Sequence, residues 1–431
     1  MLLQTVNSLL DVFFVGHLPQ SRQALAATGV GGQVIFLLIS LAMGVSVGTT
    51  ALVARFIGGG DRDGASKATS QSITLSLFIS TVCFLIFYAS KDIIVGWLLH
   101  GAEGAAAGVL CSQFLGAALL STIPLFLMNA IMGSFRGLGD TRTPMLIQGA
   151  VIATHISFNV ILIYGCLGFP RMGVQGAGTA FFLSILVGTI LYFIALVKRT
   201  PISDSLRLSE MKLELEWVNR ILKIGVPAAI QSVIRTLGMM SFTGLLARTI
   251  EGSAGVAAMQ IGLRAEALAF MPGFGYSVAA AALVGHSMGA KDIEGAEEYG
   301  WAANLQGVVV MSFMAVMFFI FANPISTLFT RDPSVQKLSA EYLQINAFCE
   351  PFIAIGIVLT GALQGAGDTV RPTFITFITM WVLRLPIAYL FMFTLNMQTV
   401  GAWYSMLIST TLAGLMTLAL FRSGKWKSIK V

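Results

Sequence analysis

Six ionisable residues lie well inside apolar stretches of the chain, and they are the first candidates for chemistry: Asp11, Arg235, Arg264, Glu266, Glu350 and Arg384. A charged side chain inside a bilayer is costly, so a residue of this kind usually has a function or a charged partner. A carboxylate there can exchange a proton or bind a cation. We therefore treat each of the six as a candidate site residue.

Asp11 is the strongest of these candidates. Gln4, Asn7 and Asp11 are spaced so that they share one face of an otherwise apolar helix. This pattern predicts a proton-exchanging carboxylate or, with Asn7 and backbone carbonyls, a site for Na⁺ as the transported ion. The alternative is a structural aspartate held by hydrogen bonds.

A second polar pair, His155 and Asn159, lies one helical turn apart in a later apolar stretch. Asn159 is the predicted partner of Asp11. His155 either joins that site or is a core histidine whose hydrogen bonds are satisfied locally.

The second half of the chain has a different set of charges. Three arginines need partners there, and two glutamates are available. We predict one pair between Arg235 and Glu266 and another between Arg384 and Glu350. The alternative is that these charges contact the substrate directly.

The composition indicates a polytopic membrane protein. Charged residues make up 11% of the chain, against about 25% in soluble domains, and hydrophobic residues make up 56%. Apolar runs long enough to span a bilayer predict twelve transmembrane helices in an all-α fold: 1–16, 24–56, 66–89, 104–135, 144–168, 174–197, 222–248, 253–287, 297–321, 335–364, 372–394 and 400–422. The first helix would rise only about 24 Å, so we expect it to be truncated and to lack its natural beginning.

Two repeated stretches divide the chain into halves of the same layout. The segment at 133–144, GSFRGLGDTRTP, returns at 361–372 as GALQGAGDTVRP, and the segment at 51–65 matches the one at 282–296. We expect two pseudo-symmetric six-helix lobes, 1–198 and 220–431, joined by a polar cytoplasmic linker at 199–219. Residues 210–222, which run from this linker into the second lobe, could form an amphipathic helix on the cytoplasmic surface. The repeat places Met239 opposite Asp11, so the acidic site is expected in the first lobe only.

Loop charges predict the orientation. The loops after the even-numbered helices, with the C-terminal tail, carry most of the chain's 26 lysines and arginines. The positive-inside rule assigns that side, including the C-terminus, to the cytoplasm of a cell with this protein in its plasma membrane. We therefore attribute the net charge of +6 to the positively charged cytoplasmic loops and not to nucleic-acid binding.

No enzyme signature is present in the sequence. It contains no Walker-type phosphate loop, no GxSxG or HExxH motif, and no acidic cluster for a diphosphate-bound metal. We expect a transporter that needs no cofactor and draws on an H⁺ or Na⁺ gradient.

The chain resembles the multidrug and toxic compound extrusion (MATE) family over nearly its whole length. The residues that carry the resemblance are Asp11–Gly16 with Ala24–Ala27, the loop Arg136–Thr141 with its echo Gln364–Thr369, and Asn159–Leu162 followed by Gly173–Ala177. The resemblance implies export of amphipathic organic compounds by a monomer, driven by H⁺ or Na⁺, with Asp11 as the coupling carboxylate.

Two departures from the family pattern point to its DinF-like branch. Many prokaryotic members have a second acidic residue where this chain has Ile163, and NorM-like members have a glutamate where it has Arg235. The first-lobe site would then consist of Asp11, Asn7, Asn159 and Thr179. Two other functions stay open: a flippase for a lipid-linked anionic precursor that uses Arg235, Arg264 and Arg384, and, with less support, a membrane-embedded transferase.

Overall fold

The protein is helical throughout the part of the chain that the computed structural model describes, which is residues 10–11, 13–18, 20–99, 102–200, 202 and 212–429. No strand occurs in these residues. Asn7 and Gln4 lie outside them, and so do residues 201 and 203–211 of the predicted linker. Residues 10–11 and 13–16 are helical, so Asp11 lies on a helix as expected.

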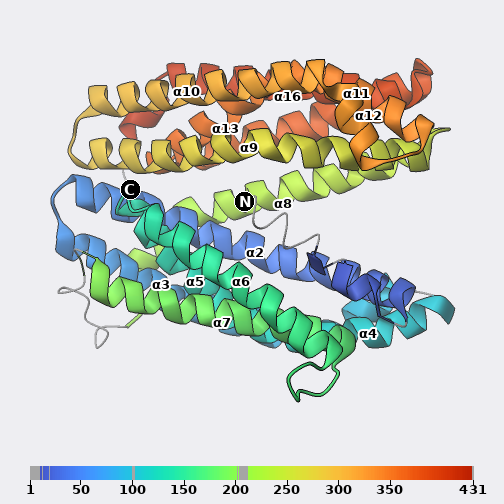
Figure 1. Ribbon diagram of the computed structural model, residues 1–431. Helices are drawn as coiled ribbons and strands as arrows, with labels where there is room; N and C mark the ends of the chain where they lie inside the picture. The colour runs from blue at the N-terminus through green and yellow to red at the C-terminus, as the bar shows by residue number, and fades with distance from the viewer. Residues whose placement is uncertain are drawn as a thin grey trace. The chain divides into compact units, whose positions relative to one another are not determined.

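Contacts divide the chain into two compact units. Unit 1 comprises Met1–Val53 and Asp61–Gly225, and unit 2 comprises Ala54–Gly60 and Val226–Val431. Unit 1 contains most of α2 (Ser21–Gly58), then α3 (Arg62–Leu98), α4 (Ala102–Ala118), η1 (Leu119–Ser121), α5 (Thr122–Gly137), α6 (Arg142–Tyr164), α7 (Gly173–Arg199) and the start of α8 (Leu215–Leu246). Within this unit α6 and α7 run side by side (Figure 1).

Unit 2 contains the remainder of α8 and all later helices. These are α9 (Gly252–Gly289), α10 (Ile293–Ile320), α11 (Ala322–Phe329), α12 (Pro333–Ala347), α13 (Glu350–Gly365), α14 (Val370–Phe377), η3 (Ile378–Arg384), α15 (Leu385–Tyr389), η4 (Leu390–Thr394), α16 (Gln398–Arg422) and η5 (Lys425–Ser428). Its core forms where α9 packs against α10, α12 and α13 (Figure 1). The last residues of α2 are counted with this unit, so α2, like α8, belongs to both units.

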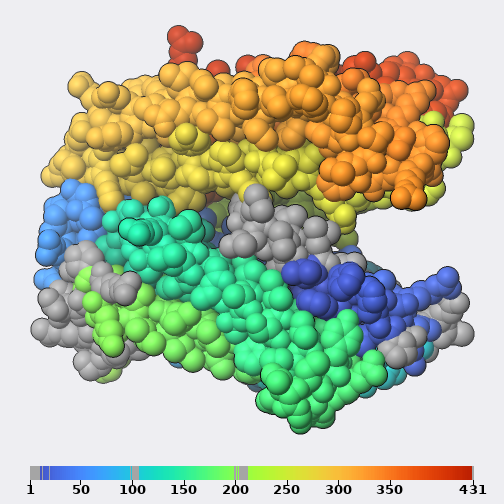
Figure 2. Space-filling model, in the orientation of Figure 1, coloured from blue at the N-terminus to red at the C-terminus, as the bar shows by residue number. Residues whose placement is uncertain are grey.

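Ten helices in the described residues are long and apolar enough to cross a membrane, or eleven if the bent pair α12 and α13 forms one span. The outer face of α10, whose surface is visible in orange in Figure 2, shows why these helices need lipid. It exposes an apolar row at helical spacing: Leu305, Val309, Phe313, Val316 and Ile320. The prediction of an all-α polytopic membrane protein is confirmed.

Several predicted helix ends were wrong. The segment expected as one helix from 335 to 364 is broken into α12 and α13, which meet at 59°, and Pro351 lies in the first turn of α13 because proline needs no hydrogen-bond partner there. Helix α3 continues past the predicted end at residue 89 through Lys91 and Asp92. No separate surface helix forms at 212–222, since Leu215 already begins α8.

The repeated sequence motifs build the same turns in both units. Asp61 accepts a hydrogen bond from the backbone N–H of Gly64 (2.7 Å) before α3, and Asp292 accepts one from Gly295 (2.9 Å) before α10. These are helix N-caps, which stabilise the free amides of the first turn. The duplicated aspartates therefore position equivalent helices in the two units.

The turns after α5 and α13 use the other repeated motif in the same way. Gly139 and Gly367 have φ values of 82° and 89°, which favour glycine. The aspartate that follows accepts from the backbone three residues later, Asp140 from Thr143 (2.9 Å) and Asp368 from Arg371 (3.4 Å).

Candidate functional site

The unit 1 site is centred on Asp11. Asn159 on α6 donates from Nδ2 to Asp11 Oδ1 at 2.6 Å, and His155 Nδ1 lies 3.8 Å from the same oxygen. The Asp11 side chain is 37% exposed, whereas that of His155 is 7% exposed. A half-exposed carboxylate with an amide donor can exchange a proton or a hydrated cation without unfolding the site.

Apolar packing fixes the helix that carries Asp11. Phe14, Val15 and Leu18 are buried in one cluster with Ile163 of α6 and Ala177 of α7. Tyr164 also donates from its hydroxyl to the carbonyl of Phe14 at 3.0 Å. Since Ile163 is fully buried in this cluster, the position where many relatives have a second acid is apolar here.

The remaining predicted members of this site differ in their placement. The hydroxyl of Thr179 on α7 donates to the carbonyl of Gln175 at 3.0 Å, one turn back on its own helix. His155 contacts Phe181 edge to face, with ring centroids 6.0 Å apart. The Oδ1 atom of Asn159 is buried and accepts no hydrogen bond from the described residues, so it could accept one from a carboxyl O–H or coordinate a cation.

Unit 2 holds a second set of charges, which is sealed inside its core. Glu266 on α9 is 3% exposed and accepts a hydrogen bond from the Tyr342 hydroxyl at 3.0 Å. Arg384, 8% exposed, donates to Ser409 Oγ at 2.8 Å and to Thr410 Oγ1 at 2.6 Å. Glu266 and Arg384 attract each other electrostatically.

Both predicted ion pairs in this region were wrong. Among the described residues Arg235 makes no ion pair with Glu266, and Arg384 makes none with Glu350. Glu350 is fully buried at the break between α12 and α13, and neither of its carboxylate oxygens accepts a hydrogen bond from the described residues. Glu350 begins α13 directly after the bend, and sequence spacing contained no sign of this bend except Pro351.

Arg235 on α8 and Arg264 on α9 form a third group. Both side chains are exposed, and no described carboxylate lies within ion-pair distance of either. The sequence prediction missed Tyr342, Ser409 and Thr410, the polar partners of the buried charges. A hydroxyl in an apolar helix is too common to single them out.

A known protein family matches most of the sequence. The model described as MatE matches residues 1–161 and 227–390, which include Asp11, Asn159, Glu266 and Arg384. The chain belongs to the MATE family. Among curated MATE relatives, a probable multidrug resistance protein NorM from Thermotoga maritima is 31% identical over 430 residues, covering 99% of this chain and 90% of that protein. The uncharacterized transporter YisQ from Bacillus subtilis is 25% identical and covers 94% and 88%.

Solved MATE structures have the same fold. One, described as the outward-facing conformation of a multidrug resistance MATE family transporter, superposes with a TM-score of 0.89 at 25% identity, covering 98% of this chain and 92% of that one. Another is a transporter from Pyrococcus furiosus, with a TM-score of 0.87 at 25% identity and the same coverage. Its description states that a reversed polarity of the binding pocket suggests a different function.

Membership in the MATE family confirms several predictions. The chain is a multi-pass membrane transporter and not an enzyme. Transport in this family is coupled to an ion gradient, requires no cofactor and acts on small organic substrates.

Proposed function

We propose that this protein exports amphipathic organic cations by antiport with H⁺ or Na⁺, with Asp11 as the coupling carboxylate. The observation that supports this most directly is the contact of Asp11 with Asn159 on a half-exposed face of unit 1. Asp11 and Asn159 are close enough to share a proton or a monovalent ion. The name of the relative from Thermotoga maritima agrees with multidrug export.

In the proposed cycle Asp11 takes up the ion from outside, and the substrate leaves. Neutralising Asp11 weakens its attraction for a cationic substrate and removes the charge from a partly dehydrated site. Loss of the ion to the cytoplasm restores the carboxylate, which can attract the next cation. A one-for-one exchange of H⁺ or Na⁺ for a monovalent cation moves no net charge, so the concentration gradient of the coupling ion must drive export, and a tenfold gradient yields about 1.4 kcal/mol.

The composition of the site favours H⁺ over Na⁺ as the coupling ion. Na⁺ prefers several oxygen ligands, whereas Asp11 has one described amide neighbour and Ile163 fills the place of a second acid. The hydroxyl of Thr179 already donates to its own helix and is a secondary ligand at most. Arg235, which stands where NorM-like members have a glutamate, supports our assignment to the DinF-like branch.

We further propose a monomer of two six-helix lobes in the plasma membrane, with the C-terminus in the cytoplasm. The duplicated caps at Asp61 and Asp292 and the duplicated turns support two equivalent lobes. The excess of positive charge in one set of loops supports the orientation.

A second candidate function is the transport of an anionic, lipid-linked compound. Arg235 and Arg264 favour it, because both are exposed and have no described carboxylate partner. Arg384 does not contribute, since it is buried and bound by Ser409 and Thr410. The Pyrococcus furiosus relative with a reversed pocket polarity makes this candidate worth a direct comparison.

The test is flux in proteoliposomes with the H⁺ and Na⁺ gradients imposed separately. We expect ethidium, a cationic probe, to move against a proton gradient and to be unaffected by a Na⁺ gradient alone. Flux that follows only the Na⁺ gradient would exclude proton coupling. Transport of an anionic lipid-linked probe in place of ethidium would favour the second candidate.

A further inference from the structure

Two helix ends that are related by the sequence repeat cross each other within unit 2. A Cβ atom on Gly58 would lie 1.9 Å from the carbonyl oxygen of His286, and a Cβ on Gly289 would lie 1.9 Å from the carbonyl oxygen of Arg55. Arg55 and Gly58 align with His286 and Gly289 in the repeat. The crossing is therefore a symmetric backbone contact that only glycine permits at these two points.

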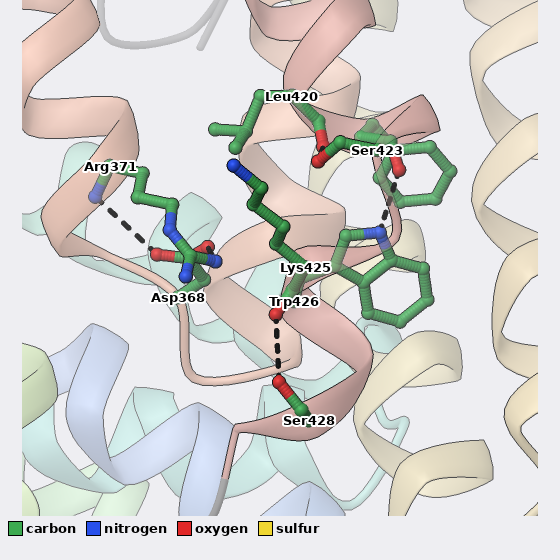
Figure 3. Close-up of polar contacts among 8 residues, drawn as sticks. Asp368, Arg371, Leu420, Ser423, Lys425, Trp426 and Ser428 are labelled. Atoms are coloured by element: carbon green, nitrogen blue, oxygen red, sulfur yellow. Dashed lines mark hydrogen bonds and ion pairs between the residues drawn. The ribbon is translucent and has the colours of Figure 1, made fainter.

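The C-terminal tail, defined here as residues 424–429, is packed beside this crossing. Gly424 turns the chain with φ 67°, and the indole of Trp426 is fully buried. The indole stacks on Phe421, with centroids 4.9 Å apart and an interplanar angle of 14°, and donates to the Phe421 carbonyl at 2.9 Å (Figure 3). A buried, stacked and hydrogen-bonded indole is a strong anchor.

Two polar contacts extend from the anchored tail. Lys427 Nζ lies 2.5 Å from Glu297 Oε2, which fixes the tail to α10. Arg55 Nη2, near the end of α2, donates to the carbonyl oxygen of Ile429 at 2.9 Å. The tail thus accepts a hydrogen bond from the end of α2, which is distant from it in the sequence.

We propose that the C-terminal tail is a clasp that holds Ala54–Gly60, the end of α2 and the turn after it, on unit 2, and that this clasp must release in each transport cycle. This inference rests on the proposed alternating-access transport. Ala54–Gly60 is counted with unit 2, whereas the rest of α2 belongs to unit 1. Any movement of one unit against the other must therefore bend α2 near Ala54 or free its end.

The contacts favour release of the α2 end over release of the tail. The tail is fixed by Trp426 and Lys427, whereas Arg55 contributes a single hydrogen bond to it. Arg55 Nη1 is buried without a described hydrogen-bond partner, which makes the held state less favourable.

A reversible cross-link tests whether release is required. A Cβ on Gly285 would lie 2.6 Å from the Cβ of Ala54, and a small shift brings this pair to the roughly 3.8 Å of a disulfide. In a background without Cys83, Cys111, Cys166 and Cys349, the double variant Ala54→Cys/Gly285→Cys is reconstituted and oxidised. We expect ethidium efflux to stop and to return on reduction, while Ala54→Cys alone is insensitive to oxidation. Unchanged efflux from fully cross-linked protein would overturn the proposal.

A labelling experiment tests the clasp without any substrate. Ala54 is completely buried, so the rate at which N-ethylmaleimide modifies the thiol of Ala54→Cys reports how often the α2 end leaves. We expect Arg55→Met and Trp426→Ala each to speed this modification about tenfold, as loss of a charged hydrogen bond or a buried anchor implies. Lys425→Ala, an exposed position in the same turn, is the matched control and should have no effect.

The two experiments separate the clasp from the proposed export function. If reduced protein does not transport ethidium but Arg55→Met speeds labelling, the export proposal fails and the clasp stands. If labelling rates equal that of the parent in both Arg55→Met and Trp426→Ala, the clasp is excluded whatever the transport result.

Discussion

The two units have the same helix caps and turns, but their intramembrane carboxylates differ in exposure. In unit 1 the carboxylate of Asp11 is 37% exposed and has one amide donor, with a histidine close by. In unit 2 Glu266 and Glu350 are at most 3% exposed, and Arg384 lies near Glu266 in a core that includes Tyr342 and Trp403. A charge that must bind and release an ion needs access to water, and of these three described carboxylates Asp11 is the exposed one.

This difference separates the roles of the two charged sets. A carboxylate can exchange a proton or an ion only if its charged and neutral states have similar free energies in the same surroundings. The unit 2 set is instead a network whose members depend on each other, where removal of one leaves another unpaired. We therefore expect loss of function from changes in unit 1 and loss of stability from changes in unit 2.

The largest effect is expected from Asp11→Asn. The amide keeps the size of the side chain but can neither release a proton nor carry the charge, so gradient-driven ethidium efflux in proteoliposomes should fall to background. The melting temperature in detergent should stay near that of the parent. Asp63→Asn, an exposed acid of the same unit, is the control, and efflux by Asp11→Asn at the parental rate would refute the coupling role.

Arg384→Met tests the opposite behaviour in unit 2. It removes the donor to Ser409 and Thr410 and leaves Glu266 without its cation, which should cost about 3 kcal/mol of stability. We expect a clear drop in melting temperature, with ion dependence retained in the protein that remains folded. An unchanged melting temperature together with lost ion coupling would place the coupling site in unit 2.

Asn159→Ala refines the description of the unit 1 site. Loss of a hydrogen bond to a charged group costs roughly 1.5–3 kcal/mol, so efflux should fall about tenfold without being abolished. Thr179→Val is the matched comparison, because the Thr179 hydroxyl already donates to Gln175, and it should change efflux little. Equal losses from both variants would mean that Thr179 contacts the ion directly.

The smallest effects should be the same in both units. Asp61→Ala and Asp292→Ala each remove a helix N-cap of the same geometry, and each should cost on the order of 1 kcal/mol. The two melting temperatures should shift by similar small amounts, with transport retained. A much larger loss from one of them would show that the repeated aspartates have different roles.

Sequence alone was sufficient for the features that follow from composition and local chemistry. Apolar runs predicted the membrane helices, and the polar face of the first helix identified Asp11 and led to Asn159 as its neighbour. The pairing of the unit 2 charges could not be predicted, because it depends on the bend between α12 and α13 and on distant hydroxyls such as Ser409. Sequence separation contains no information about which face of a bent helix meets which neighbour.

The crossing of α2 into unit 2 also bears on how the polypeptide could be divided. A chain cut in the polar stretch before α8 would yield two fragments that are not independent bodies, because the first would still have its Ala54–Gly60 segment seated among residues of the second. The fragments would recognise each other through that segment and through the acceptor carbonyl of Ile429. We therefore expect co-expressed halves to associate through this helix end, even without the linker that joins them in the intact chain.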